Sequence, residues 1–405
     1  MTQTGFANLT QAIENSIEQK KSTYILASHR IHERPEIGNE EVFASAELTG
    51  LLKEAGFSIE RGIAGHATAF IARKGTAGSG PTVAFLAEYD ALPGLGHACG
   101  HNIIGTTSIA AAIALSETLE ETGGQVVVLG TPAEEGGDNG SAKGSFVKDN
   151  RLEGIDAALI IHPGNATRVS GSSLAVDPVD YIYHGKPAHA AGSPEKGINA
   201  LDSIIQLFNG INALRQHVTD DVRIHGIIPD GGKAANIVPD YARARFFIRA
   251  ATRPKTNEIR AKIDKIAEGA ALATGSKLEI HEFQNAVDDL LPNDVLNNLF
   301  IDTFRRFGED VLETEKSGLG STDTGNISQV VPTIHPYIQI GPDVLVGHTV
   351  AFREAAKSAK GDEALITGAK GLALIGLKLL TDTETLHAAK AELMERKRAA
   401  AADVG

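Results

Sequence analysis

Side chains that bind metal ions follow four apolar, strand-like segments of this 405-residue sequence. The four polar clusters are AEYDALPGLGHACGH after TVAFL, TPAEEGG after QVVVL, HPG after AALII, and GPDVLVGH after YIQI. They contain the candidate residues Asp90, Cys99, His101, Glu134, Glu135, His162 and His348. Thiolate, imidazole and carboxylate are the groups that bind zinc in proteins. These residues outnumber the ligands of one structural zinc, which suggests two metal ions, or one metal ion with catalytic residues.

Most of these residues also have a purely structural interpretation. A single buried cysteine is usually a small hydrophobic residue, but Cys99 lies between His97 and His101, and this context favours a ligand. The spacing does not decide which of the two histidines would bind. Glu134 and Glu135 would ordinarily form a solvated acidic pair. After a strand as apolar as QVVVLG, adjacent carboxylates are costly without a cation, so one would bind metal and the other would handle a proton.

The remaining histidines are weaker evidence when each is taken alone. His162 after AALII could be a hydrogen-bonded core residue, and the GHT sequence at His348 occurs by chance. His189 follows a strand-like segment in GKPAHAAGSPEKGINALD. Small residues in such a loop allow a ligand or another backbone to approach closely.

Composition and missing motifs exclude several other classes of protein. The formal net charge is −13, so we expect neither a nucleic acid nor an anionic membrane surface as a partner. The serine-hydrolase motif G-x-S-x-G and the Walker motif are absent. The N-terminus lacks the apolar run of a secretory signal, and Lys370 and Lys378 interrupt the most apolar late stretch. With a single cysteine and therefore no internal disulfide, we expect a cytoplasmic protein.

The elements that must position the candidate residues indicate an α/β domain. VAFLA, VVVLG and AALII are nearly continuous apolar runs, as in strands buried on both faces of a parallel sheet. Helical patterns such as NIIGTTSIAAAIALSETLEE alternate with them. Ligands of open parallel sheets collect at the carboxyl ends of the strands. The polar clusters should therefore meet at one edge of the sheet.

From about residue 177 the pattern changes to that of a small sheet with helices. Strand-like and helical segments follow one another there in the order β-α-β-β-α-β, and after about residue 287 the earlier alternation resumes. We therefore predict a metal-binding catalytic domain, residues 1–176 and 288–405, with a mostly parallel sheet. Residues 177–287 are predicted to form an inserted α+β domain of ferredoxin-like topology.

Several long motifs identify a family resemblance that covers nearly the whole chain. They are AEYDALPGLGHACGHN, TPAEEGG, HGKPAHAAGSPEKGINALD, GGKAANIVPD and GSTDTGNISQVVPTIHPYIQIG. In this order they closely resemble the aminoacylase and carboxypeptidase family of co-catalytic metallopeptidases. The resemblance is strongest to the amidohydrolase branch with p-aminobenzoyl-glutamate hydrolase and β-alanyl-lysine-type dipeptidases. It is more distant to auxin-amino-acid conjugate hydrolases, whose acidic motif differs from GSTDTGN, so their substrate choice is not transferred.

The resemblance implies a role for each candidate at the metal site. Cys99 matches the position that bridges two metal ions, which is an aspartate in more distant relatives. Glu134 matches the general base, and Asp90 matches a residue that orients groups of the metal site. The other implied metal ligands are His101, Glu135, His162 and His348, which leaves His97 beside the ligands rather than among them.

The resemblance also implies a role for the inserted domain, which matches a lid that forms the dimer interface. His189 matches a histidine that stabilises the developing oxyanion in the active site of a neighbouring subunit. Asn236 and Arg249 match, more loosely, lid residues that meet the carboxylate of the substrate. The expected assembly is therefore a homodimer.

The expected activity is metal-dependent hydrolysis of an amide or peptide bond in a small substrate, an N-acyl or aryl-amido amino acid or a dipeptide. Water activated by two divalent metal ions attacks the carbonyl while Glu134 takes its proton. Thiolate and imidazole favour zinc, and manganese is the alternative because relatives vary in metal use. The rival functions are a dipeptidase or carboxypeptidase acting on ordinary or β-alanyl dipeptides, and a metal-binding protein without catalysis. The intact Glu134 argues against the latter.

Overall fold

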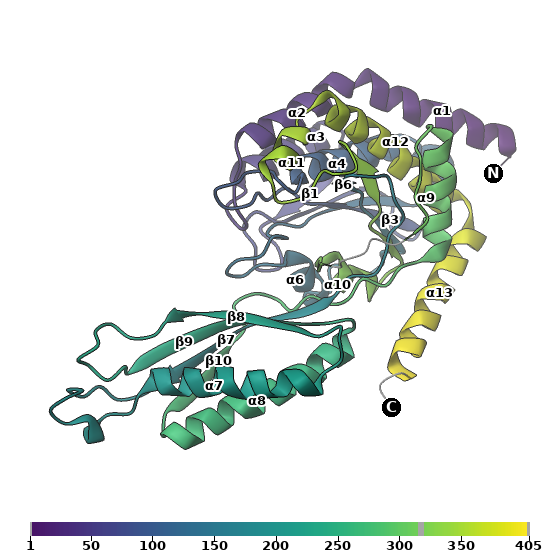
Figure 1. Cartoon of the computed structure of the whole chain (residues 1–405). Helices are drawn as coiled ribbons and strands as arrows, with labels where there is room; N and C mark the ends of the chain where they lie inside the picture. The colour runs from purple at the N-terminus through teal and green to yellow at the C-terminus, as the bar shows by residue number, and fades with distance from the viewer. Residues whose placement is uncertain (1, 315–319, 403–405) are drawn as a thin grey trace. The chain divides into compact units, whose positions relative to one another are not determined.

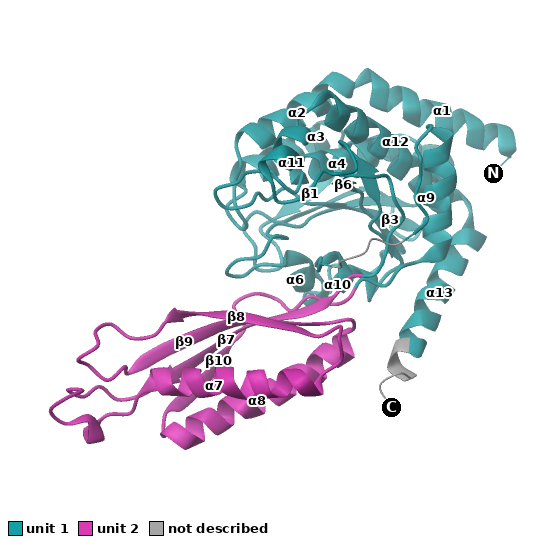
Figure 2. Cartoon of the chain, viewed as in Figure 1, with its two compact units in different colours: residues 1–172, 290–399 teal, residues 173–289, 400–405 magenta. Residues whose placement is uncertain are grey.

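The computed structural model describes residues 2–314 and 320–402, which form two compact units (Figures 1 and 2). Unit 1 comprises Met1–Ser172 and Leu290–Ala399, and unit 2 is built from Ser173–Asp289. The boundaries expected at residues 177 and 287 lie a few residues inside unit 2. The reason is that strand β7 (Ala175–His184) begins before residue 177 and Val176 pairs with Val287.

Unit 1 contains a six-stranded sheet in the order β1-β2-β4-β3-β5-β11. Strands β4, β3, β5 and β11 are parallel to one another, and β2 and β1 extend the sheet in antiparallel pairing. A separate parallel pair consists of β6 and β12. The strands are β1 (Ser58–Arg61), β2 (Phe70–Gly75), β3 (Thr82–Ala87), β4 (Gln125–Gly130), β5 (Ala157–Leu159), β6 (His162–Gly164), β11 (Thr333–Ile334) and β12 (Tyr337–Gln339). The fold is mixed α/β with a mostly parallel sheet, as the sequence predicts.

Helices cover both faces of this sheet (Figure 1). Every residue of β3 is buried. Val83 and Phe85 pack in a cluster with α4 and α12, whereas Ala84 and Leu86 pack with α6 and α10 on the opposite face. Burial on both faces explains the continuous apolar run of this strand. The described helices of unit 1 are α1 (Gln3–Gln19), α2 (Lys21–Glu33), α3 (Val42–Glu54), α4 (His101–Ser116), α5 (Leu119–Thr122), α6 (Ala142–Lys148), α9 (Asp294–Arg306), α10 (Thr324–Ser328), α11 (Val350–Ala355), α12 (Ala359–Thr381) and α13 (Thr383–Ala402).

Helix α12 is the central helix of the larger hydrophobic core. Among the described residues, it alone has the length and hydropathy of a membrane-spanning helix, and 78% of its most apolar window is buried inside the protein. Gly371 lies against the ring of Phe304 and Gly376 against Leu115, so the helix packs closely on its neighbours. This environment is that of a helix in the core of a protein.

Unit 2 contains a four-stranded antiparallel sheet in the order β10-β7-β9-β8. Helices α7 (Ala200–Leu214) and α8 (Arg253–Thr274) pack on one face of it (Figure 1). The other strands are β8 (Arg223–Asp230), β9 (Tyr241–Ala250) and β10 (Lys277–His281). Alternate residues of β9 are buried, as expected for a sheet with one covered face. Along the chain the elements follow the order β7-α7-β8-β9-α8-β10.

Candidate active site

The candidate residues of unit 1 lie directly after its parallel strands. Glu88 and Asp90 follow β3, Glu134 and Glu135 follow β4, and His162 begins β6 after β5. Because β4, β3 and β5 are parallel neighbours, their carboxyl ends lie at the same edge of the sheet. The three segments therefore deliver carboxylate and imidazole groups to one place.

Cys99 and His101 reach the same edge through the turn at the start of α4. Gly100 is the N-cap of this helix and has a φ of 79°, in the left-handed region. A Cβ atom on Gly100 would overlap with Cγ of Pro163. Only glycine fits this conformation and this close approach without strain. The glycine between Cys99 and His101 thus brings both side chains beside β6.

Donor atoms of these segments form overlapping groups in which all atoms lie within 4.8 Å of one another. One group contains Cys99, His101 and His162, and a second contains Cys99, Glu135 and His348. The distance from Cys99 Sγ to His162 Nε2 is 3.4 Å, and His348 Nε2 lies 3.5 Å from Glu135 Oε1. The sulfur of Cys99 is therefore close to two different sets of potential ligands.

Glu134 lies beside these groups and belongs to a third one with His101 and Glu135. His101 Nε2 is 3.8 Å from Glu134 Oε2 and 3.9 Å from Glu135 Oε1. Burial, together with the negative charges of Glu88 and Glu135, raises the pKa of Glu134 well above its ordinary value. A proton or a cation is thus strongly favoured at this carboxylate.

Asp90 fixes two of the neighbouring groups. Its Oδ1 accepts a hydrogen bond from His101 Nδ1 at 2.9 Å, and its Oδ2 accepts one from the backbone N–H of Glu135 at 2.9 Å. The ring of His162 is held in a similar way, because its Nδ1 lies 2.6 Å from the carbonyl oxygen of Pro163. These contacts leave the Nε2 atoms of both histidines for a metal ion, as is usual in metal sites.

Several buried polar atoms at this edge have no hydrogen-bond partner among the described residues. They include Glu88 Oε2, His101 Nε2 and Glu135 Oε1. Unpaired buried polar atoms are costly unless another group satisfies them. Burial lowers the pKa of His162 to about 3, so its imidazole is neutral and has a free lone pair. Thiolate, imidazole and carboxylate donors in this arrangement fit divalent metal ions.

The structure separates the two histidines that flank Cys99. His101 joins the groups of potential ligands, whereas His97 is absent from them. The ring of His97 is buried and stacks on that of His32 with 6.1 Å between the centroids. His101 is therefore the flanking histidine with ligand geometry.

Four residues at the site were not predicted from the sequence. Lys143 Nζ donates to Glu88 Oε1 at 2.7 Å and to Asp323 Oδ1 at 2.5 Å. His335 is buried, with its ring 5.5 Å from that of His162. Glu88, Asp323 and His335 lie in the motifs AEYD, GSTDTGN and TIHPY, so their positions carried a signal. Nothing in GSAKGSF distinguishes Lys143.

The other three predicted residues belong to unit 2. His189 is exposed, and its Nδ1 accepts the backbone N–H of Gly192 at 3.0 Å. The carbonyl of Asn236 accepts the N–H of Ala190 at 3.0 Å, so Asn236 and His189 lie on adjacent segments. Asn236 precedes the start of β9, whereas Arg249 lies near its end and pairs with Val176. Along an extended strand, Arg249 is about 25 Å from Tyr241, the first residue of β9. Within unit 2 the structure thus brings His189 and Asn236 together but not Arg249.

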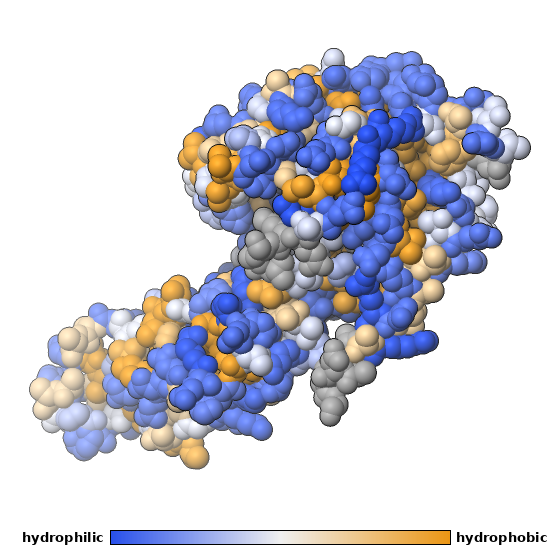
Figure 3. Space-filling model, turned by 45° about the vertical axis from the view of Figure 1, so that its right-hand side comes forward, coloured by the Kyte–Doolittle hydropathy of each residue, from blue (hydrophilic) through white to orange (hydrophobic). Residues whose placement is uncertain are grey.

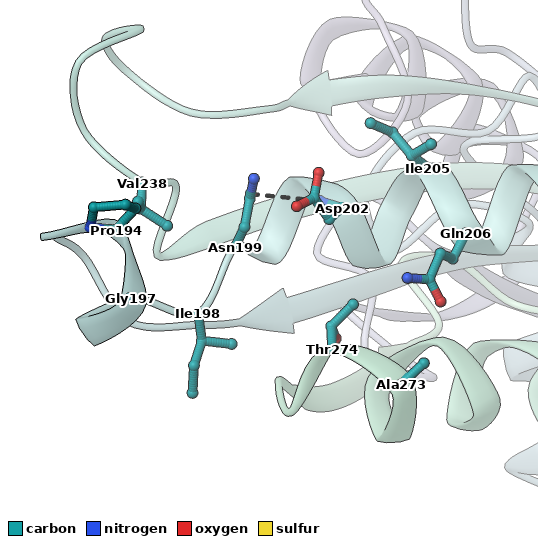
Figure 4. A pocket seen from close by; sticks show the side chains of 10 residues that line it. All are labelled: Pro194, Gly197, Ile198, Asn199, Asp202, Ile205, Gln206, Val238, Ala273 and Thr274. Carbon is teal, nitrogen blue, oxygen red and sulfur yellow. Dashed lines mark hydrogen bonds between the residues drawn. The ribbon is translucent and has the colours of Figure 1, made fainter. Parts of the chain in front are cut away.

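Unit 2 also contains a pocket of about 590 Å³, whose ten lining residues are shown in Figure 4. They include neither histidine nor cysteine. Asn199 in its wall caps α7 by accepting the backbone N–H of Leu201. The side chain of Asn199 therefore stabilises the start of α7, and the lining offers neither imidazole nor thiolate to a metal ion.

Comparison of the sequence with protein families agrees with the chemistry of the site. The model of peptidase family M20/M25/M40 matches residues 84–375. The Xaa-Arg dipeptidase of Mus musculus is 34% identical over 381 residues, covering 90% of this chain and 87% of that protein. One of the subunits of the p-aminobenzoyl-glutamate hydrolase of Escherichia coli is 35% identical over 325 residues, covering 75% of this chain and 66% of that polypeptide.

Solved structures show the same fold. The aminobenzoyl-glutamate utilization protein of Klebsiella pneumoniae has a TM-score of 0.73 at 19% identity, covering 90% of this chain and 98% of that one. A Bacillus subtilis protein described as a dinuclear metal binding peptidase has a TM-score of 0.65 at 20% identity, covering 90% and 99%. Together with the sequence matches, these findings make the chain a metallopeptidase or amidohydrolase. It belongs to peptidase family M20/M25/M40.

Proposed function

We propose that two divalent metal ions act in this enzyme, held by Cys99, His101, Glu135, His162 and His348. The observation that carries the proposal is that two groups of potential ligands share the sulfur of Cys99. Thiolate and imidazole favour zinc, with manganese as the alternative. When bound, the metal ions would polarise the carbonyl of the substrate and lower the pKa of the attacking water.

Glu134 is the general base of this proposal. It accepts the proton of the attacking water and returns it to the leaving amine. Its buried, negatively charged surroundings favour the protonated form that exists between these two steps. Asp90 orients His101 and the backbone of Glu135 through its two hydrogen bonds.

Unit 2 is proposed to be the lid and the dimerisation domain, with a ferredoxin-like topology. Large apolar side chains are exposed on it, among them Ile227, which is 64% exposed on the outer strand β8. Orange, apolar atoms lie among polar ones over this unit in Figure 3. Exposed apolar surface of this kind is typical of a protein interface and supports a homodimer. The other large exposed apolar residues of unit 2 include Ile205, Ile228, Ile237 and Leu272.

His189 is proposed to stabilise the oxyanion in the active site of a neighbouring subunit. Because its Nδ1 accepts a backbone N–H, its Nε2 carries the proton and can donate to an anionic oxygen. Asn236 lies on the adjacent segment and would meet the carboxylate of the same substrate. Since Arg249 lies at the far end of β9, we propose that it meets the substrate from a different subunit than His189 does.

The proposed substrate is a small N-acyl or aryl-amido amino acid, hydrolysed in the cytoplasm. Dipeptides are the second candidate. The Mus musculus relative, 87% of whose length is covered by this chain, is a dipeptidase. The test is hydrolysis of N-acetyl amino acids, ordinary and β-alanyl dipeptides, and p-aminobenzoyl-glutamate by protein loaded with zinc or manganese. Cleavage within one class assigns the substrate. Cleavage of none contradicts the proposal.

The variant Glu134→Gln tests the mechanism. It should keep the fold and the bound metal but lose nearly all turnover, because an amide cannot accept the proton. Asp138→Asn, an exposed carboxylate in the same loop, is the matched control and should keep its activity. Substantial turnover by Glu134→Gln would remove Glu134 from the role of general base.

A further inference from the structure

Lys143 is a fully buried lysine next to the proposed metal site. It lies on α6, and its side chain has no exposed surface. Its Nζ contacts Glu88 Oε1 at 2.7 Å and Asp323 Oδ1 at 2.5 Å, and its backbone N–H donates to the other oxygen of Asp323 at 3.2 Å. Burial of an ammonium group is costly unless charged partners surround it. The two carboxylates provide these partners.

Glu88 extends this ion pair to the metal site. While its Oε1 accepts from Lys143, its Oε2 is buried, has no hydrogen-bond partner among the described residues, and lies 3.5 Å from His101 Nε2. That nitrogen is the one left for a metal ion, because Asp90 holds Nδ1. The position of Lys143 thus determines where the second oxygen of Glu88 lies.

The same cluster contains the proposed general base. Oxygen atoms of Glu88, Glu134 and Asp323 lie within 4.8 Å of one another. Carboxylates this close repel each other strongly in a buried site. Lys143 supplies a positive charge to them, and it does so with directed N–H groups that a freely exchanging ion lacks.

We propose that Lys143 is a positioning residue of the metal site, whose ammonium holds Glu88 with its second oxygen directed to His101 and balances the carboxylates around Glu134. This inference rests on the proposed metal-dependent hydrolysis. Lys143 does not touch the reacting atoms. It acts through Glu88, and its positive charge weakens the attraction of the site for divalent ions.

The experiment compares the metal-loaded wild type with Lys143→Met and with the double variant Lys143→Met/Asp323→Asn. The single variant removes the ammonium and keeps an unbranched side chain that is one heavy atom shorter. The double variant also removes one negative charge, so the net charge of the cluster equals that of the wild type. Lys148→Met, an exposed lysine of the same helix, is the matched control. The measurements are kcat, KM and zinc affinity by chelator competition.

The proposal predicts that zinc affinity follows the charge of the cluster and that kcat follows the position of Glu88. Removing the charge should raise the zinc affinity of Lys143→Met by about tenfold or more, and the double variant should return it to the wild-type value. The kcat should fall about 100-fold in both variants with KM unchanged, because neither holds Glu88 in place. The control should match the wild type in all three quantities.

Two results would overturn the proposal. A double variant with wild-type kcat would show that only the charge matters and that Glu88 needs no positioning. Unchanged zinc affinity in a folded Lys143→Met would show that the ammonium does not act on the metal site. If the single variant does not fold, the kcat of the charge-balanced double variant tests the proposal. A fall supports the positioning of Glu88, and a wild-type value contradicts it. If the wild type hydrolyses no substrate, the proposed function fails, and the zinc affinities still test Lys143.

Discussion

Glu41 is a buried carboxyl group whose titration should be visible in the stability of unit 1. Its Oε1 accepts the backbone N–H of Ala133 at 2.9 Å, and its Oε2 accepts the hydroxyl of Thr68 at 2.7 Å. Burial, followed by the negative charge of Asp90, raises the pKa of Glu41 from 4.5 to about 7. In Glu41→Gln, the amide oxygen can keep the bond to Ala133 and the amide nitrogen can donate to Thr68. The variant therefore removes the titration and keeps both contacts.

The direction of the effect follows from the two pKa values of Glu41. Between pH 4.5 and about pH 7 the unfolded chain has released this proton while the folded protein still holds it. The free energy of unfolding therefore has the full contribution of Glu41 below pH 4.5 and loses it as the pH rises to about 7. A pKa difference of about 2.5 units corresponds to about 3 kcal/mol. The glutamine variant lacks this dependence.

The free energy of unfolding is measured by urea titration at several pH values. Hydrogen exchange of peptides from β4 is the readout, because it reports the unfolding of unit 1. Between about pH 4 and pH 8 the stability of the wild type relative to Glu41→Gln should fall by about 3 kcal/mol. Glu40→Gln, the exposed neighbour, should change by less than about 0.5 kcal/mol over the same range. A constant difference between wild type and Glu41→Gln, or one that grows in favour of the wild type with pH, would refute the reasoning.

Three further predictions concern the metal site. Asp90→Asn leaves one acceptor for two N–H donors, so zinc affinity by chelator competition should fall about 10- to 100-fold; unchanged affinity would contradict the orienting role. In Gly100→Ala the new Cβ atom meets Pro163, so the free energy of unfolding in a urea titration should fall by about 2 kcal/mol or more. Gly94 has a φ of 70° but open space around it, so Gly94→Ala should lower the same quantity by only about 1 kcal/mol. Removal of metal by a chelator should abolish hydrolysis and lower the Tm, and added zinc or manganese should reverse both; full activity without metal would contradict the metal-dependent mechanism.

The edge at which the site forms was predictable because its cause is local in the sequence. The runs TVAFLA and QVVVLG are typical of strands buried on both faces, and the structure has them as parallel neighbours. Polar residues directly after such strands must meet at one edge of the sheet. Asp90 and Glu135 are therefore found beside each other although 45 residues separate them. His101 joins them because Gly100 allows a sharp turn into α4.

The charge balance of the site was not predictable because its cause is not local. Lys143 contacts a carboxylate 55 residues away and another 180 residues away. In the sequence it is an ordinary lysine on a short helix, where an exposed side chain is the expected state. Only the folded arrangement of β3, α6 and α10 shows that two carboxylates enclose it.

The orientation of Glu134 combines both kinds of cause. The residues on either side of it, Ala133 and Glu135, donate their backbone N–H groups to two buried carboxylates, Glu41 and Asp90. Ala133 has a φ of 58°, a conformation that costs free energy in any residue with a Cβ atom and persists only where its surroundings enforce it. The Glu41 carboxyl group, which holds the Ala133 N–H, lies 92 residues earlier in the chain. The sequence thus predicts which side chain can take the proton, whereas distant buried carboxylates determine where that side chain lies.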